Sequence, residues 1–124
     1  MKTLLLLLVA TTLYGQPDFK SVISAIKAGN TAGIGAYMDA NVEVTVGDKD
    51  GIYAKSKAIS VVSDFFKEHI PSNCSLVHSG AARDEASYYC IGNLSAKGAQ
   101  YRVYIFFKKV GGTYLIQEMR FEKE

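Results

Sequence analysis

Apolar residues recur at helical spacing in three stretches before residue 71. The first stripe lies between Asp18, which suits an N-cap, and Gly29, which suits a helix end, so it predicts a helix over residues 18–28. Thr31 can cap a second, short helix. Ser56 can cap a third and longest helix, whose apolar surface is wide enough to predict burial of more than half its circumference. That surface consists of Ala58, Ile59, Val61, Val62, Phe65, Phe66 and Ile70.

Alternating and densely apolar stretches predict strands in the rest of the chain. The segment NVEVTV at 41–46 alternates valine with polar residues, and Ile52 and Tyr53 can return beside it after the turn GDKDG. Pro71 blocks continuation of the long helix. Four further strands are predicted at about 73–79, 86–95, 100–109 and 113–121. This order predicts an α+β fold, with helices packed on one face of a curved, mostly antiparallel sheet.

The last two predicted strands form a hairpin that is apolar on both faces. Gly111 and Gly112 suit a two-residue turn, which would pair Val110 with Thr113 and therefore Ile105 with Glu118. In this register Ile105 and Glu118 share one face of the hairpin. The other face is too apolar for open solvent, so we expect a partner to cover it. That face would hold Arg102, Tyr104, Phe106, Leu115, Gln117 and Met119.

The N-terminus has the pattern of a secretory signal peptide. Lys2 precedes the apolar run 4–10, and Gly15 is a small residue at a plausible cleavage point. Two threonines follow the apolar run too early for a membrane span, which needs about 20 apolar residues. We therefore expect a signal peptide at residues 1–15 and a single domain at 16–124. The domain would be exported to the periplasm or the extracellular space, with no transmembrane segment.

Charge and cysteine content narrow the classes of partner. Removing Lys2 from the 14 basic residues leaves 13 against 12 acidic ones, with no basic run, so nucleic acid is not an expected partner. Two Cys and two His with no Gly-rich phosphate loop predict neither a metal nor a cofactor. In an exported domain, Cys74 and Cys90 could form a disulfide if their hairpin is centred near Ala82. The alternative is a pair of buried thiols in unmatched registers.

Longer stretches carry a family resemblance. The chain contains AIKAGNTAGIGAYMDANVEVTV, then GIYAKSKAISVVSDFF, and then the four long strands. Together they resemble the nuclear transport factor 2-like superfamily, whose cone-shaped members wrap a bent sheet around a long helix and leave a pocket between them. Within it, the chain is similar to a family of secreted bacterial domains of unknown function. The shared stretches are GN at 29–30, YMDANVEV at 37–44, YAKSKA at 53–58, DFF at 64–66, YCIGNL at 89–94 and YRVYI at 101–105.

The resemblance implies the fold more strongly than a function, because this superfamily hosts enzymes, binders and scaffolds alike. Its ketosteroid isomerases use a Tyr and two Asp, and the matching positions here are Val22, Val44 and Ile105. The resemblance therefore does not imply isomerase chemistry. It also implies that Ile105 faces the interior of the cone, and that a homodimer formed sheet to sheet would cover the outer face of the hairpin.

Three functional hypotheses follow. The first is a non-catalytic pocket for a small apolar or amphipathic ligand, in which Glu118 binds a polar group and Tyr37, Tyr53, Tyr101 and His78 lie nearby. The second is an enzyme that uses Glu118 as a base. The third is a dimeric interaction scaffold whose cone is filled by side chains and holds no ligand. Glu118 could equally pair with a Tyr hydroxyl or Arg120 for structure alone, or face water if the register differs by one residue.

Overall fold

The structure is a computed structural model that describes residues 15–82, 84 and 86–124. The predicted signal peptide at 1–15 lies almost wholly outside these residues. Within them the chain forms three helices and six strands. The helices are α1 (Phe19–Lys27), α2 (Thr31–Gly35) and α3 (Lys55–Glu68). The strands are β1 (Met38–Val46), β2 (Lys49–Ala54), β3 (Pro71–Ala81), β4 (Ser87–Ala96), β5 (Ala99–Val110) and β6 (Thr113–Lys123).

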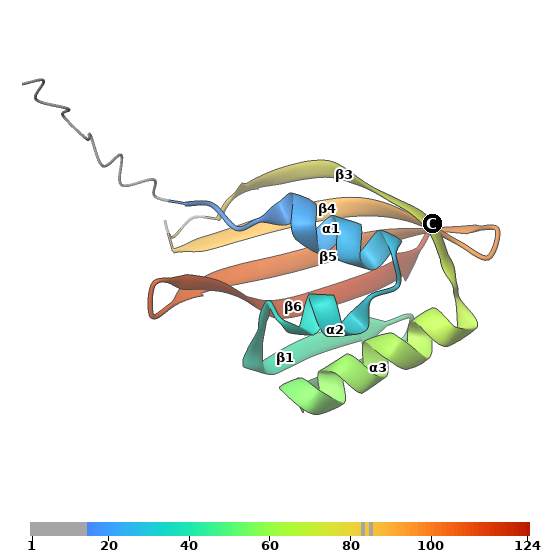
Figure 1. Cartoon of the computed structure of the whole chain (residues 1–124), viewed down its shortest axis with the longest axis horizontal. Helices are drawn as coiled ribbons and strands as arrows, with labels where there is room; N and C mark the ends of the chain where they lie inside the picture. The colour runs from blue at the N-terminus through green and yellow to red at the C-terminus, as the bar shows by residue number, and fades with distance from the viewer. Residues whose placement is uncertain (1–14, 83, 85) are drawn as a thin grey trace, which may run out of the picture.

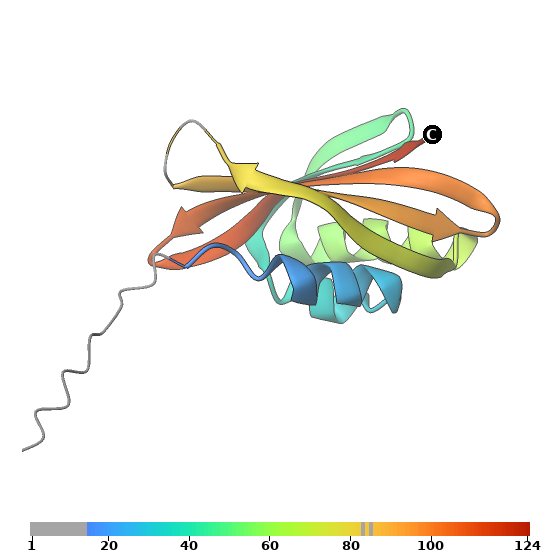
Figure 2. The ribbon, with the colours of Figure 1, turned by 90° about the horizontal axis from the view of Figure 1, so that it is seen from above.

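The six strands form one curved sheet in the order β2-β1-β6-β5-β4-β3. Neighbouring strands are antiparallel except β1 and β6, which are parallel. All three helices lie on one face, which we call the inner face (Figures 1 and 2). The predicted α+β class and the curved, mostly antiparallel sheet are therefore confirmed. None of the helices in the described part of the chain is long and apolar enough to cross a membrane.

Helix α1 follows the sequence prediction closely. The carboxylate of Asp18 accepts hydrogen bonds from the Ser21 backbone N–H at 3.1 Å and from the Ser21 hydroxyl at 2.6 Å. These bonds satisfy a backbone donor that a helix start leaves free. The stripe of Phe19, Val22, Ile23 and Ile26 is buried against the sheet.

The predicted caps of the other two helices are wrong. Asn30, not Thr31, caps α2 by accepting a hydrogen bond from the Gly33 N–H at 3.0 Å. Helix α3 starts directly after β2, with Ala54 at its N-cap and no side-chain cap, so Ser56 lies inside the first turn. Because the extended N-cap conformation falls on Ala54, Ser56 is already helical and its hydroxyl does not accept a hydrogen bond from the N–H groups of the first turn.

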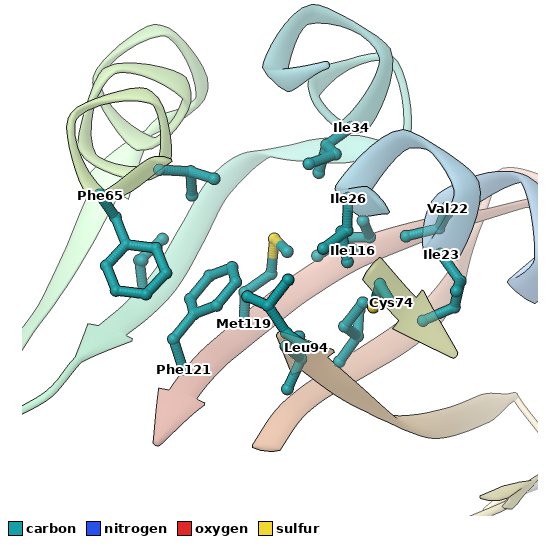
Figure 3. Close-up of a cluster of buried hydrophobic side chains, with 14 of the residues drawn as sticks. Val22, Ile23, Ile26, Ile34, Phe65, Cys74, Leu94, Ile116, Met119 and Phe121 are labelled. Carbon is teal, nitrogen blue, oxygen red and sulfur yellow. The ribbon is translucent and has the colours of Figure 1, made fainter. Parts of the chain in front are cut away.

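The core fills the space between the helices and the inner face (Figure 3). On α3 its members are Ala58, Val62, Phe65 and Phe66. The buried stripe of α3 is thus narrower than the predicted one, since Val61 is only half-buried and Ile70, beyond the helix, is 67% exposed. The largest fully buried side chains include Phe107, Phe121, Ile26, Ile34, Leu94, Ile105, Ile116 and Met119.

A β-bulge in β6 overturns the predicted pairing of Ile105 with Glu118. The turn pairs Val110 with Thr113 as expected, but the register shifts between Phe107 and Phe106. Ile105 therefore pairs with Met119, which is fully buried on the inner face. Glu118 pairs with Phe106 and lies on the outer face.

The bulge coincides with contacts to a distant part of the chain. Gln117 is the extra residue, and its side-chain amide donates a hydrogen bond to the Asp39 carboxylate at 3.0 Å. The neighbouring strand β1 is also irregular between Met38 and Glu43. Bulges that re-aim the following side chains are common in strongly bent sheets, and this one reverses the facing of every residue after Gln117.

The two cysteines do not face each other, so the predicted arrangement for a disulfide is wrong. Cys74 pairs with Leu94, whereas Cys90 pairs with Ser79, and both thiols are free and buried. Four residues along β4 separate Cys90 from Leu94, about 13 Å at ~3.3 Å per residue, and a disulfide needs Cα atoms within about 7 Å. Burial raises the pKa of Cys74 to about 11 and that of Cys90 to about 12.

Candidate functional site

A cleft of about 420 Å³ opens on the inner side of the molecule, between α3 and the β1–β2 hairpin. Both layers of the fold contribute to its lining, which brings together an apolar floor and a charged rim. Its lining residues are Val44, Val46, Lys49, Tyr53, Lys57, Val61, Asp64, Phe65, Glu68 and His69.

The floor of the cleft is made by residues that the local patterns place there. Val44 and Val46 lie two apart on β1 and so share the inner face. Val61 and Phe65 lie four apart on α3 and so share one side of the helix. The floor is therefore a continuation of the core, in which Val44 and Phe65 are buried and Val46 and Val61 remain half-exposed.

Gly51 makes room for the ring of Tyr53 at one wall of the cleft. A Cβ atom at position 51 would lie 2.6 Å from the Tyr53 ring, which is closer than side chains can approach. The pairing of Val44 with Gly51 and of Val42 with Tyr53 puts this ring on the inner side of the hairpin. The absence of a side chain at position 51 thus lets the Tyr53 ring pack along the strand.

Charges of both signs surround the floor. Lys49 lies near the tip of the hairpin and Lys57 in the first turn of α3, whereas Asp64 and Glu68 lie in its second half. The Asp64 carboxylate is 3.9 Å from the Lys67 ammonium, and both side chains are about three-quarters exposed. Such an exposed pair stabilises little, so the rim carboxylates are available to a polar group of a ligand.

His69 closes the end of the cleft beside α3. Its Nδ1 and the Phe65 carbonyl oxygen are 3.1 Å apart, and its ring stacks on the Phe65 ring with 4.5 Å between centroids. The Tyr101 ring meets it edge-on at 5.6 Å. His69 is therefore held in place by its contacts with Phe65 and Tyr101, and the same imidazole also lines the cleft.

The structure does not gather the five predicted pocket residues in one place. Of these, Tyr53 alone lines the cleft. Tyr37 borders a shallow depression between α1 and α2, and Tyr101 is buried against the Phe65 ring at 5.4 Å. Glu118 and His78 lie on the outer face, because bulges at Gln117 and Val77 turn them there. Their role in binding a ligand stays a prediction.

Glu118 lies in a charged group on the outer face. Its side chain is 19% exposed and accepts a hydrogen bond from the Arg120 guanidinium at 3.1 Å. Glu43 is its neighbour on β1. The pKa of Glu43 is raised, first by burial and then by the carboxylates of Asp50 and Glu118. This arrangement is the structural pairing with Arg120 that the sequence left open, and it lies apart from the cleft.

Aromatic side chains cover the centre of the outer face. The rings of Tyr89 and Tyr104 stack at 6.2 Å between centroids, and His78 Nε2 lies 2.9 Å from the Tyr89 hydroxyl oxygen. Ile91 and Phe106 lie beside them on the same strands and are half-buried. We call Tyr89, Ile91, Tyr104 and Phe106 the outer patch. In the part of the chain that the structure describes, no three His, Cys, Asp or Glu side chains are placed to hold a metal ion.

The fold is that of the nuclear transport factor 2-like class. One solved structure that it resembles is an NTF-2 like protein of unknown function from Silicibacter pomeroyi, at 11% identity and a TM-score of 0.60. That match covers 85% of this chain and 88% of the other. At this level of identity, the likeness shows the fold alone.

The family is defined by a match over most of the sequence. Residues 19–122 match the domain of unknown function DUF4783, and the chain belongs to this family. A DUF4783 protein from Bacteroides ovatus is 30% identical with a TM-score of 0.82, over 89% of this chain and 98% of that one. A DUF4783 protein from Bacteroides uniformis is also 30% identical, with a TM-score of 0.80 over 86% and 97%. No curated protein matches the sequence.

Proposed function

We propose that this protein is an exported binding domain that holds a small amphipathic ligand in the cleft between α3 and the β1–β2 hairpin. The observation that carries the proposal is the combination of an apolar floor with a rim of both charges. Ligand sites are typically apolar concavities of about 300–1,000 Å³ with a few convergent polar groups. The cleft, at about 420 Å³, falls within that range.

The lining suggests how such a ligand would lie. An apolar body would cover the half-buried Val46 and Val61 and remove them from water, which stabilises the complex by about 25 cal/mol per Å² of buried apolar surface. A polar head would reach Lys49 or Lys57, and the Tyr53 hydroxyl lies on the same wall. The export part of the proposal rests on the leader-like sequence at 1–15.

The proposal assigns no reaction to the cleft. Glu118, which the enzyme hypothesis used as the catalytic base, lies on the outer face and is hydrogen-bonded to Arg120. The imidazole Nδ1 of His69 is engaged with the Phe65 carbonyl group. A binding role therefore accounts for the lining without requiring a catalytic group.

The fluorophore 8-anilinonaphthalene-1-sulfonate, an apolar body with one negative charge, is a suitable probe. Val61→Phe adds volume at a half-buried position of the floor and should weaken binding by about tenfold, which corresponds to about 1.4 kcal/mol. The matched control is Val77→Phe, the same substitution at an exposed position on β3, which should leave the affinity unchanged. Fluorescence titration gives both dissociation constants. Equal affinity in the two variants would refute the cleft as the site.

A second candidate function is dimerisation through the outer patch. The observation that favours it is that Tyr89, Ile91, Tyr104 and Phe106 adjoin on neighbouring strands and remain partly exposed. Contiguous apolar surfaces of this kind are typical of interfaces. Sedimentation velocity of Phe106→Glu, which puts a charge in the patch, tests it. Loss of a dimer in this variant supports the patch, and an unchanged state refutes it.

A further inference from the structure

The cleft meets a second concavity at the end of α3. This second concavity has a volume of about 670 Å³, and Glu68 and His69 line both. The end of α3, the turn between β4 and β5 and the end of β6 form it, and these three segments lie at the same end of the molecule (Figure 1). We call it the terminal depression, and besides the two shared side chains its lining includes Lys67, Lys97, Tyr101 and Lys123.

Three aromatic rings connect the cleft with the terminal depression. The Phe65 ring lines the cleft, and the His69 ring stacks on it with 4.5 Å between centroids. The Tyr101 ring lines the terminal depression and meets the His69 ring edge-on at 5.6 Å. Phe65 and Tyr101 are buried, whereas His69 is half-buried. A ligand that extends from one concavity into the other would therefore pass over the His69 ring.

The two concavities differ in charge. Two lysines and two acidic residues line the cleft, whereas three lysines and one glutamate line the terminal depression. Lys67 lies in the last turn of α3, where the helix dipole favours a basic residue. Lys97 and Lys123 belong to other elements, are exposed, and form no ion pair within the part of the chain that the structure describes. The neighbouring Glu124 carboxylate lies 3.7 Å from Arg102 Nε instead.

We propose that the ligand of the cleft is an elongated amphipathic anion, an aliphatic chain that ends in a carboxylate. Its chain lies on the cleft floor, and its carboxylate reaches Lys97 and Lys123 in the terminal depression. The inference rests on the proposed function and adds the class of ligand. Val61 on the floor precedes Glu68 by seven residues, which is about 10 Å along the helix at ~1.5 Å per residue. Only an extended molecule bound at Val61 reaches the lysines.

The terminal depression is the more favourable end for the acidic group. Lys49 and Lys57 share the cleft with Asp64 and Glu68, so an anion bound there meets attraction and repulsion together. In the terminal depression three cations act with one carboxylate, and their attractions to an anion add up. The charge difference therefore orients the ligand along α3.

Displacement of 8-anilinonaphthalene-1-sulfonate by decanoate, below the concentration at which micelles form, tests the inference. Lys97→Glu and Lys123→Glu should each weaken decanoate binding by about fivefold, the upper range for an exposed ion pair. Each should tighten the binding of decyltrimethylammonium, which has a similar chain and the opposite charge. Lys108→Glu is the matched control, because it makes the same charge change at an exposed position at the other end of β5. It should leave both affinities unchanged.

Val61→Phe separates this inference from the proposed function. It should weaken the binding of the fluorophore and of decanoate, because both cover the cleft floor. If it does so while the two lysine variants leave decanoate unaffected, the elongated anion is overturned and the cleft stands as a binding site. Failure of decanoate to displace the fluorophore from the parent protein has the same meaning.

Two further outcomes would overturn the inference. Weaker decanoate binding in the lysine variants but not in Val61→Phe would mean that the anion binds in the terminal depression alone. Equal weakening in Lys97→Glu, Lys123→Glu and Lys108→Glu would assign the effect to the net charge of the protein. Circular dichroism shows whether each variant keeps its fold.

Discussion

The two longer helices cover the same face of the sheet but pack against it differently. Helix α1 is capped by Asp18, and its whole apolar stripe is buried beside β3 and β4. Helix α3 has no side-chain cap, and Val61 on its apolar surface is half-open to the cleft. Figure 2 shows the β1–β2 hairpin beside α3 diverging from the strands that lie over α1.

This difference separates two tasks within one small domain. The α1 half supplies close packing, which sets stability, whereas the α3 half keeps a concave surface lined by otherwise ordinary core residue types. The cleft leaves Val46 and Val61 only half-buried, which costs some apolar burial. Close packing elsewhere on the sheet offsets that loss. The comparison therefore predicts that substitutions on the α1 side are the more destabilising ones.

The largest expected contrast is in thiol reactivity. Cys74 and Cys90 lie buried on the α1 side, and their raised pKa values, about 11 and about 12, keep them protonated at pH 8. Alkylation by iodoacetamide should therefore require unfolding and be slower than in urea by about 10³-fold or more. A third cysteine, introduced by Val61→Cys, should be alkylated as fast as a free thiol.

Intact-mass spectrometry over time follows this reaction. The expected result is one rapid adduct in Val61→Cys, none in the parent protein, and two in the unfolded parent. Fast modification of the parent would show that the α1 half opens as readily as the cleft. Failure of the unfolded, unreduced parent to gain two adducts would show that Cys74 and Cys90 are bonded.

The next contrast is in stability. Ile26→Ala removes a fully buried side chain from α1 and should lower the free energy of unfolding by about 2–5 kcal/mol. Val61→Ala, in the cleft wall, should cost about 1 kcal/mol or less, because the side chain is already half-exposed. Urea denaturation measures the free energy of unfolding of both variants. Equal losses would mean that α3 is packed as closely as α1.

The smallest contrast is in capping and its dependence on pH. Asp18→Ala should lower the free energy of unfolding by about 1 kcal/mol at pH 7. The pKa of Asp18 is lowered in the fold, first by the Ser21 hydroxyl and then by the Ser21 backbone N–H. The carboxylate therefore stabilises the protein above the ordinary carboxyl pKa of about 3.9, and this contribution disappears as pH falls through the folded value.

Thermal unfolding of the parent protein and Asp18→Ala at neutral and acidic pH measures this effect. The two melting temperatures should differ at pH 7 and converge at the lowest pH where both fold. Asp18→Asn is the control, since its amide oxygen can still cap the helix without titrating. A constant difference at all pH values would assign the effect to something other than the carboxylate.

Periodicity predicted the parts of this fold that depend on many residues at once. The stripe of α1, the alternation of β1 and the four-strand run all appear where the sequence places them. The prediction that Glu118 faces the interior was wrong because it depended on the position of a single residue. The bulge at Gln117 carries no Gly or Pro to mark it, and it coincides with a contact to Asp39, 78 positions earlier.

The cleft could have been anticipated only in part. The apolar surface of α3 is wider than its buried stripe, and Val61 is one of the apolar residues that lie outside that stripe. That excess is visible in the sequence, but it is equally compatible with full burial. Which side of a wide helix stays open depends on the path of the β1–β2 hairpin, including the missing side chain of Gly51 beside Tyr53.

The bulge at Gln117 also divides the last strand into two phases. Before it, even-numbered positions such as Ile116 face inward; after it, odd-numbered ones such as Met119 and Phe121 do so. Loss of Gln117 alone would remove the bulge and leave a regular alternation in which Glu118 still faces outward and Met119 and Phe121 still face inward, whereas loss of two residues here would reverse the facing of Met119 and Phe121. Position 117 is therefore the point in β6 where evolution can insert or remove a single residue without changing which side chains of the C-terminal segment reach the core.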